Sequence, residues 1–215
     1  MNNFIIRNER PDDFRAVEEM TRKAFWNVNR EGCDEHYLVH IMRSHPDFIP
    51  ELDFVAESKN GEIIGNVMYT KSKLVDENGT QETILTFGPL SVRPDHQRKG
   101  VGKALLEYSF PKAIEMGYKA IVIFGSPANY VARGFKACRK YNICAPSGRF
   151  PTAMMVKELV SDCFDGRRRV FHESPLFEFD GADAEKFDAG FEPMEKGFSP
   201  TQEEFYILSH SAFRE

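Results

Sequence analysis

The sequence DHQRKGVGKALL occupies residues 95–106, where an extended segment gives way to a helical pattern. Gly100 and Gly102 stand at the start of that helix. A helix N-terminus carries free N–H groups and a partial positive charge, and glycine lets a ligand approach the backbone closely. These features predict an anion site that holds a phosphate group. Three cationic residues reinforce the prediction: Arg98, Lys99 and Lys103.

Three phosphate-binding patterns can be compared with this stretch. A P-loop needs glycine at position 97 and Ser or Thr at position 104, but the chain has Gln97 and Ala104. A dinucleotide fingerprint needs a small residue at position 105, where the chain has Leu105. The pattern that remains is Gln-x-x-Gly-x-Gly, which ends at Gly100 and Gly102.

The longer segment LSVRPDHQRKGVGKALL, residues 90–106, resembles the acetyl-CoA-binding core motif of the GNAT family of N-acetyltransferases. Downstream, YVARGF at residues 130–135 is similar to the Tyr-x-x-x-Gly-Phe segment of that family. The order of expected elements from Phe4 to about Leu159 also agrees with the family fold. The fold class implied is α/β (α+β), with a mixed, mostly antiparallel twisted sheet, flanking helices and splayed central strands.

The resemblance implies that acetyl-CoA is a cosubstrate. Its pantetheine arm would lie between the splayed strands and pair with the backbone near Leu90 and Val92. Backbone N–H groups of residues 98–103 would hold the pyrophosphate. The residues predicted to bind the cosubstrate are Leu90, Ser91, Val92, Gln97, Arg98, Lys99, Gly100, Val101, Gly102, Lys103, Asn129, Tyr130 and Phe135.

The residue pattern predicts the surrounding elements independently of the resemblance. Apolar spacing predicts helices ending near Phe25 and over residues 34–43. Asn60-Gly61 predicts a hairpin turn between two strands, and a third strand follows in QETILTFGPLSV. Because proline lacks an N–H, Gly88-Pro89 predicts a bulge or a lost neighbour in this strand, an opening where a ligand can enter.

The second half of the pattern begins with a helix over residues 100–117, in which Pro111 predicts a kink or a break. YKAIVIFG then predicts a strand buried on both faces and reached by a parallel crossover. A short helix closed by Gly134 and a strand near residues 152–159 follow. We expect a main domain over residues 1–160 and an extension over 161–215 that packs on it and ends in a helix after Ser199.

The reaction implied is direct transfer of acetyl from the thioester to a primary amine of a small molecule or protein, in a ternary complex. Tyr130 occupies the position of the family's usual acid, and a backbone N–H near Leu90 would stabilise the oxyanion. A core aromatic beside Phe135 is the structural alternative for Tyr130. The strand TILTFGPLSV lacks the glutamate that many relatives place there, so no general base is assigned.

Residues of the helix–loop region after Phe25 are candidates for the acceptor site, because this region usually walls it in the family. They are Trp26, Glu31, Glu35 and His36. His36 and His40 have the i, i+4 spacing of a metal pair, but no HExxH motif or third ligand accompanies them, so we expect no metal.

The totals restrict the partners and the location. The net charge of −5 argues against nucleic acid, and no apolar run reaches the length of a membrane span. The N-terminus lacks the apolar core of a signal peptide and the four cysteines form no CxxC pair, so we expect a cytoplasmic protein. A homodimer through the extension is a further expectation. The alternative function is a non-catalytic acyl-CoA-binding or regulatory module.

Overall fold

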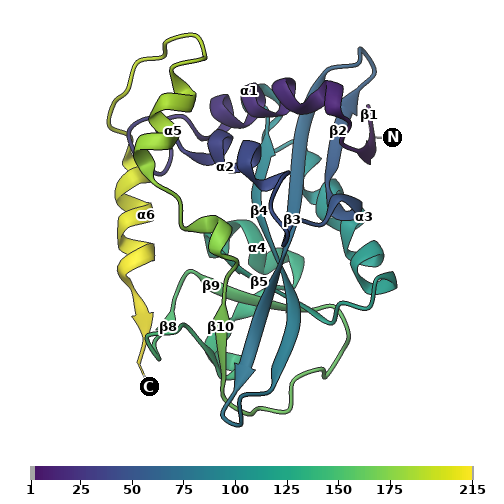
Figure 1. Cartoon of the computed structure of the whole chain (residues 1–215), viewed down its shortest axis with the longest axis vertical. Helices are drawn as coiled ribbons and strands as arrows, with labels where there is room; N and C mark the ends of the chain where they lie inside the picture. The colour runs from purple at the N-terminus through teal and green to yellow at the C-terminus, as the bar shows by residue number, and fades with distance from the viewer. Residues whose placement is uncertain (1–2, 215) are drawn as a thin grey trace. The chain divides into compact units, whose positions relative to one another are not determined.

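A computed structural model describes residues 3–214 and shows a mixed α+β fold, in which a mostly antiparallel sheet is flanked by helices (Figure 1). This confirms the predicted fold class. The chain divides into two units, each assembled from three segments. The first unit holds residues up to Tyr69, Gly88–Ser109 and Pro175–Gln202, and the second holds Thr70–Phe87, Phe110–Ser174 and the residues from Glu203. The boundary expected near residue 160 stays a prediction.

In the first unit, β1 (Phe4–Asn8), β2 (Phe54–Ser58) and the first part of β3 (Ile63–Asp76) are antiparallel neighbours. The turn between β2 and β3 closes as predicted, with the Ser58 N–H donating to the Glu62 carbonyl and Gly61 in the left-handed region at φ 80°. The last part of β4 (Gln81–Val92) follows β3 in the strand order.

Helices α1 (Phe14–Phe25) and α2 (Glu35–Met42) form where the apolar spacing predicts them. They lie side by side and contact each other (Figure 1). Together they share a buried apolar cluster with Val55 of β2 and Met68 of β3. The amphipathic stripe of each helix therefore covers one face of the sheet in this unit.

The opposite face of the same strands carries α3 (Val101–Glu115). The ring of Phe54 lies 5.1 Å from that of Tyr108, and the Tyr69 hydroxyl lies 2.6 Å from the Ser109 hydroxyl. Successive side chains of a strand point to opposite faces, which explains why Phe54 and Val55 serve different helices.

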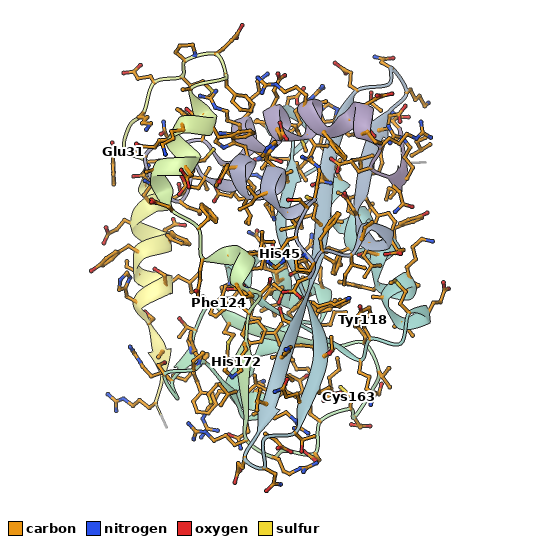
Figure 2. The ribbon with its side chains drawn as sticks, viewed as in Figure 1. Glu31, His45, Tyr118, Phe124, Cys163 and His172 are labelled. Carbon is orange, nitrogen blue, oxygen red and sulfur yellow. The ribbon has the colours of Figure 1, made fainter. Side chains whose placement is uncertain are left out.

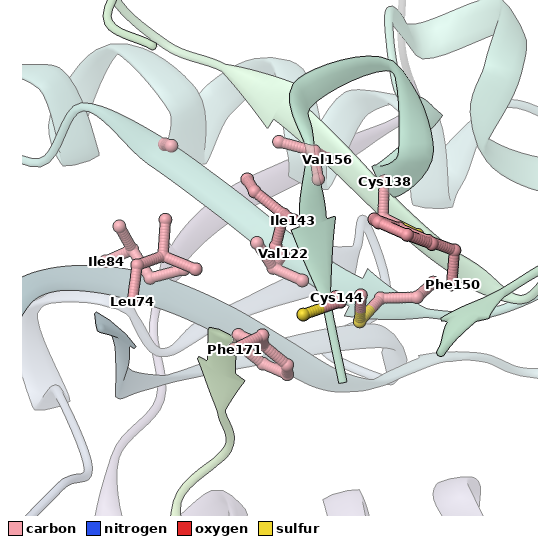
Figure 3. Close-up of a cluster of buried hydrophobic side chains, with 11 residues drawn as sticks. Leu74, Ile84, Val122, Cys138, Ile143, Cys144, Phe150, Val156 and Phe171 are labelled. Atoms are coloured by element: carbon pink, nitrogen blue, oxygen red, sulfur yellow. The ribbon is translucent and has the colours of Figure 1, made fainter. Parts of the chain in front are cut away.

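In the second unit, β5 (Ala120–Phe124) pairs in parallel with β4 at Leu85 and Ile121. It pairs along its whole length with antiparallel β9 (Met154–Glu158), which also pairs with β6 (Lys136–Ala137). The parallel crossover through α3 is thus confirmed. The buried cluster of this unit surrounds Val122 and Phe171 (Figure 3).

The remaining elements are shorter. The late strand β10 (Arg169–His172) pairs with the end of β3 and with β7, so residues beyond 160 complete the sheet. The others are α4 (Pro127–Tyr130), β7 (Ile143–Cys144), β8 (Phe150–Pro151), α5 (Gly181–Asp188), α6 (Pro200–His210) and β11 (Ala212–Phe213). The final helix confirms the prediction after Ser199, whereas β10 and α5 were not predicted.

Two prolines give different outcomes. The helix α3 continues through Pro111, so the predicted break does not occur. At Gly88-Pro89 the strand β4 continues, but the chain passes there from the second unit to the first. Within residues 3–214, no helix is long and apolar enough to cross a bilayer.

Candidate functional site

The glycine-containing stretch forms a turn with alternating backbone handedness. After a 3-10 turn over Pro94–His96, Arg98 has φ 57° and Gly100 has φ 88°. Glycine adopts this region at no steric cost, whereas arginine rarely does. Left-handed residues that alternate with right-handed ones turn successive N–H groups towards a common point, which is the geometry of an anion-binding nest.

Six consecutive amides of this turn are free to bind a ligand. In the part of the chain that the structure describes, the backbone N–H groups of residues 98–103 donate no hydrogen bond to protein, and the next N–H, that of Ala104, donates to the Gly100 carbonyl. The first N–H groups of any helix lack intrahelical acceptors. Here the turn adds further donors in front of the helix, as the sequence predicted.

The charge around these amides is positive. Arg98 and Lys99 are exposed, and neither has a carboxylate partner among the described side chains. Lys103 forms an exposed pair with Glu107, whose carboxylate lies 3.4 Å from the ammonium. An anionic ligand can therefore approach the start of α3 without displacing a buried ion pair.

The turn is attached to the end of β4. The Gln97 side chain donates a hydrogen bond of 3.2 Å to the Val92 carbonyl, so it holds the strand rather than pointing among the free amides. A Cβ atom added at Gly102 would lie 3.5 Å from the Val92 side chain and 3.7 Å from that of Leu90. The structure thus brings the predicted loop together with residues 90–92.

Ser91 lies between those two strand residues, but its side chain points away from solvent. Its hydroxyl accepts a hydrogen bond of 2.9 Å from Thr21 of α1, and both side chains are fully buried. The Arg93 N–H then donates to the Ile64 carbonyl of β3 at 3.0 Å. The end of β4 is therefore fixed by α1, by β3 and by Gln97.

The predicted acid, Tyr130, belongs to the second unit. Its ring packs against Phe87 and Phe135, with ring centroids 5.7 Å apart in both pairs. Burial raises the pKa of the Tyr130 hydroxyl to about 12, so the group carries its proton at neutral pH. Among the described residues, that hydroxyl has no hydrogen-bond partner. Asn129 is exposed, and its carbonyl accepts from the Arg133 side chain.

Leu90 and residues 98–103, which we call the amide turn, belong to the first unit. Asn129, Tyr130 and Phe135 belong to the second unit. The role of Tyr130 as an acid beside the coenzyme A sulfur therefore stays a prediction. Gly125 explains the local position of the tyrosine ring, because a Cβ atom there would lie 2.6 Å from the Tyr130 ring.

Two of the acceptor candidates line a shallow pocket in the first unit. Trp26 donates its indole N–H to the Glu195 carbonyl at 2.8 Å, and the Arg22 guanidinium lies over its ring. Glu31 is exposed in the loop after α1 (Figure 2). Both residues line the pocket together with Asp188 of α5. This pocket is therefore formed in part by the C-terminal extension.

The other two candidates are held in protein contacts. Glu35 is half-buried and accepts a hydrogen bond of 2.7 Å from Asn29, while burial raises the pKa of its carboxyl group. His36 is fully buried, and burial lowers the pKa of its imidazole. Its Nε2 atom lies 3.0 Å from an Asp188 oxygen, outside hydrogen-bonding direction. His36 is a core residue covered by Phe187 of α5.

One class of enzyme fold combines these features: a mixed sheet, unbonded backbone N–H groups at the start of α3, and a tyrosine after β5. The model of the acetyltransferase (GNAT) family matches residues 14–137, more than half of the chain. The chain belongs to this family.

Sequence and structural relatives agree with the assignment. An uncharacterized N-acetyltransferase, YhbS of Escherichia coli K12, is 28% identical over 163 residues, which cover 76% of this chain and 92% of that protein. A crystal structure of E. coli YhbS in complex with CoA has a TM-score of 0.70 at 25% identity, covering 83% of this chain and 94% of that one. A Brucella melitensis GNAT acetyltransferase in complex with acetyl-CoA has the same fold, with a TM-score of 0.63 at 22% identity over 82% and 99% of the two chains.

Proposed function

We propose that this chain is an N-acetyltransferase that moves an acetyl group from acetyl-CoA to a primary amine of a small molecule or a protein. The observation that carries the proposal is the fan of six free amides over residues 98–103. A diphosphate offers several acceptor oxygens and negative charge, and both are favoured at a helix N-terminus. The CoA complex of the related YhbS protein supports the same ligand.

The chemistry follows from the predicted positions of Leu90 and Tyr130. In a ternary complex the amine nitrogen attacks the thioester carbon, and the carbonyl oxygen becomes an oxyanion that the Leu90 N–H stabilises. The C–S bond then breaks as the amide forms. The thiolate takes a proton from the Tyr130 hydroxyl, the amine releases one to water, and water returns a proton to the tyrosinate. Burial raises the pKa of Tyr130 to about 12, so the hydroxyl carries its proton at neutral pH when the thiolate forms.

The amine must be neutral when it attacks. An amine with a lysine-like pKa of ~10.4 is neutral in roughly one molecule in two to three thousand at pH 7. The described residues of β4 carry no carboxylate in the stretch TILTFGPLSV, so we propose that a water chain rather than a strand glutamate removes the proton. Observed rates should therefore rise with pH as the amine deprotonates.

The absence of a carboxylate from that described stretch of β4 also favours a second candidate function, an acyl-CoA-binding or regulatory module without turnover. Release of free CoA from acetyl-CoA, measured with a panel of primary amines, separates the two. Acceptor-dependent release supports the enzyme. Tight acetyl-CoA binding without such release supports the module.

Binding itself is tested by calorimetry with CoA and a matched pair of glycine variants. Gly100→Ala and Gly79→Ala both place alanine at a positive φ, 88° and 78°, with no atom within 4 Å of the new Cβ. Only Gly100 lies in the amide turn, so only Gly100→Ala should weaken CoA binding, by about tenfold. Equal affinity in both variants, or no heat with the unmodified chain, would contradict the proposal.

We propose an amine as the acceptor and expect neither nucleic acid nor membrane as a partner. A homodimer through residues 161–215 is part of the same proposal. Light scattering that gives a monomeric mass at micromolar concentration would exclude the dimer without affecting the proposed reaction.

A further inference from the structure

Gly65 of β3 lies directly beneath the start of α3. A Cβ atom on Gly65 would lie 2.7 Å from Cγ1 of Val101 and 3.0 Å from Cδ1 of Leu105. On its third side it would meet the Ser91 carbonyl oxygen at 3.3 Å. The backbone of Gly65 is not in the left-handed region, so space alone requires glycine at this position.

Val101, the closest of these neighbours, belongs to the amide turn. Val101 is the first residue of α3, it is 2% exposed, and its N–H is one of the six free amides. A β-branched side chain has little χ1 freedom, so Val101 cannot swing aside as a long flexible chain would. A side chain at position 65 would therefore push the first turn of α3 away from the sheet.

The end of β4, on the other side of Gly65, is also held in place. Ser91 is fixed by its buried hydrogen bond to Thr21, and the following Arg93 N–H pairs with Ile64. The end of β4 thus stays in place while the helix start would have to move. Moving the start of α3 relative to the end of β4 would separate the free amides from the strand to which Gln97 is hydrogen-bonded.

We infer that Gly65 is a positioning residue that sets the height of the amide turn above the sheet and thereby determines the affinity for CoA. This inference rests on the proposed function, because it assigns Gly65 to the same ligand. Neither the sequence motif nor the position of Gly65 in the chain identifies this role. Glycine inside a strand is the general signal for close approach of another backbone or side chain.

The test uses the full chain and measures CoA affinity by calorimetry, with thermal melting as a check on folding. Gly65→Ala should bind CoA about tenfold more weakly, since overpacking moves the turn. Val101→Ala removes the methyl groups that the new Cβ would meet. The double variant Gly65→Ala/Val101→Ala should therefore bind within about threefold of Val101→Ala alone.

Gly197→Ala is the matched control, because its Cβ would have no atom within 4 Å and its backbone is also outside the left-handed region. It should bind CoA like the unmodified chain. If the unmodified chain binds no CoA, the proposed function fails. If it binds and Gly65→Ala binds equally well, only the present inference fails. Should Gly65→Ala melt early and bind weakly, recovery of binding in the double variant supports the inference, and no recovery overturns it.

Discussion

The hydroxyl oxygens of Thr21 and Ser91 lie 2.9 Å apart, and both side chains are fully buried. Replacing Ser91 by alanine leaves the Thr21 hydroxyl without its acceptor inside the protein. We expect Ser91→Ala to lower the free energy of unfolding by about 1–3 kcal/mol, measured by urea denaturation. Thr21→Val/Ser91→Ala, which removes both hydroxyls, should recover part of that loss. A double variant that is as unstable as the sum of both single variants would show that the pair is not coupled.

The extension is fixed to α1 by a forked ion pair. Arg22 donates to both oxygens of Asp188, at 2.6 Å and 3.1 Å, and the Arg22 side chain is 5% exposed. Asp188→Ala leaves that guanidinium buried without its carboxylate, so we expect a loss of about 3 kcal/mol in the free energy of unfolding.

Asp183 offers the matched control in the same helix. It pairs with Lys186 at 2.9 Å, but both side chains are largely exposed. Asp183→Ala should therefore change the free energy of unfolding far less than Asp188→Ala does. Equal effects of the two variants in chemical denaturation would mean that the Arg22–Asp188 pair does not fix the extension.

Tyr130→Phe tests the proposed acid. The ring contacts with Phe87 and Phe135 survive the change, so the affinity for CoA should stay constant while kcat falls by about 10²-fold or more. Because burial places the pKa of Tyr130 at about 12, the unmodified enzyme should show no loss of activity from this group below about pH 10.

Tyr141 provides the comparison, because burial also raises its pKa to about 12 and its ring packs on Phe164. Tyr141→Phe should leave kcat unchanged. Steady-state kinetics with the best amine of the panel measures both variants, and an unaltered kcat in Tyr130→Phe would remove the tyrosine from the mechanism.

Asp53 makes the stability of the protein depend on pH. Burial raises the pKa of its carboxyl group to about 9, and a hydrogen bond with Glu9 acts in the same direction. The unfolded chain releases this proton near pH 4, whereas the folded chain keeps it up to about pH 9. The contribution of Asp53 to stability is therefore full below about pH 4 and is lost as the pH rises towards 9.

Asp53→Asn removes this titration and keeps an oxygen that can accept the 3.0 Å hydrogen bond from Asn66. Urea denaturation at pH 5, 7 and 9 should show a flatter pH dependence for the variant than for the unmodified chain. Identical slopes for both proteins would place the buried proton elsewhere.

The amide turn could be predicted from sequence because its signals are local. Gly100 and Gly102 sit within a few residues of the cationic side chains, and the free N–H groups follow from helix geometry alone. The left-handed conformation of Arg98 could not be predicted, because an arginine has no preference for it.

Contacts between distant segments explain most of what the sequence did not reveal. Gly65 signals a close approach but not that α3 makes it, and Thr21 gives no sign of Ser91, which is 70 residues away. The sequence near His36 does not indicate that α5, far along the chain, covers this side chain. Residues 161–215 have weak periodicity, because their strand and helices are stabilised by neighbours far along the chain rather than by their own pattern.

The division of the chain into interleaved segments has a consequence for its synthesis. Trp26 and Arg22 leave the ribosome well before their partners Glu195 and Asp188, which lie more than 160 positions later. The unit that contains Arg22 must therefore wait, with part of its apolar surface exposed, until residues 175–202 have been translated. A chain that ends near residue 160 would lack segments of both units.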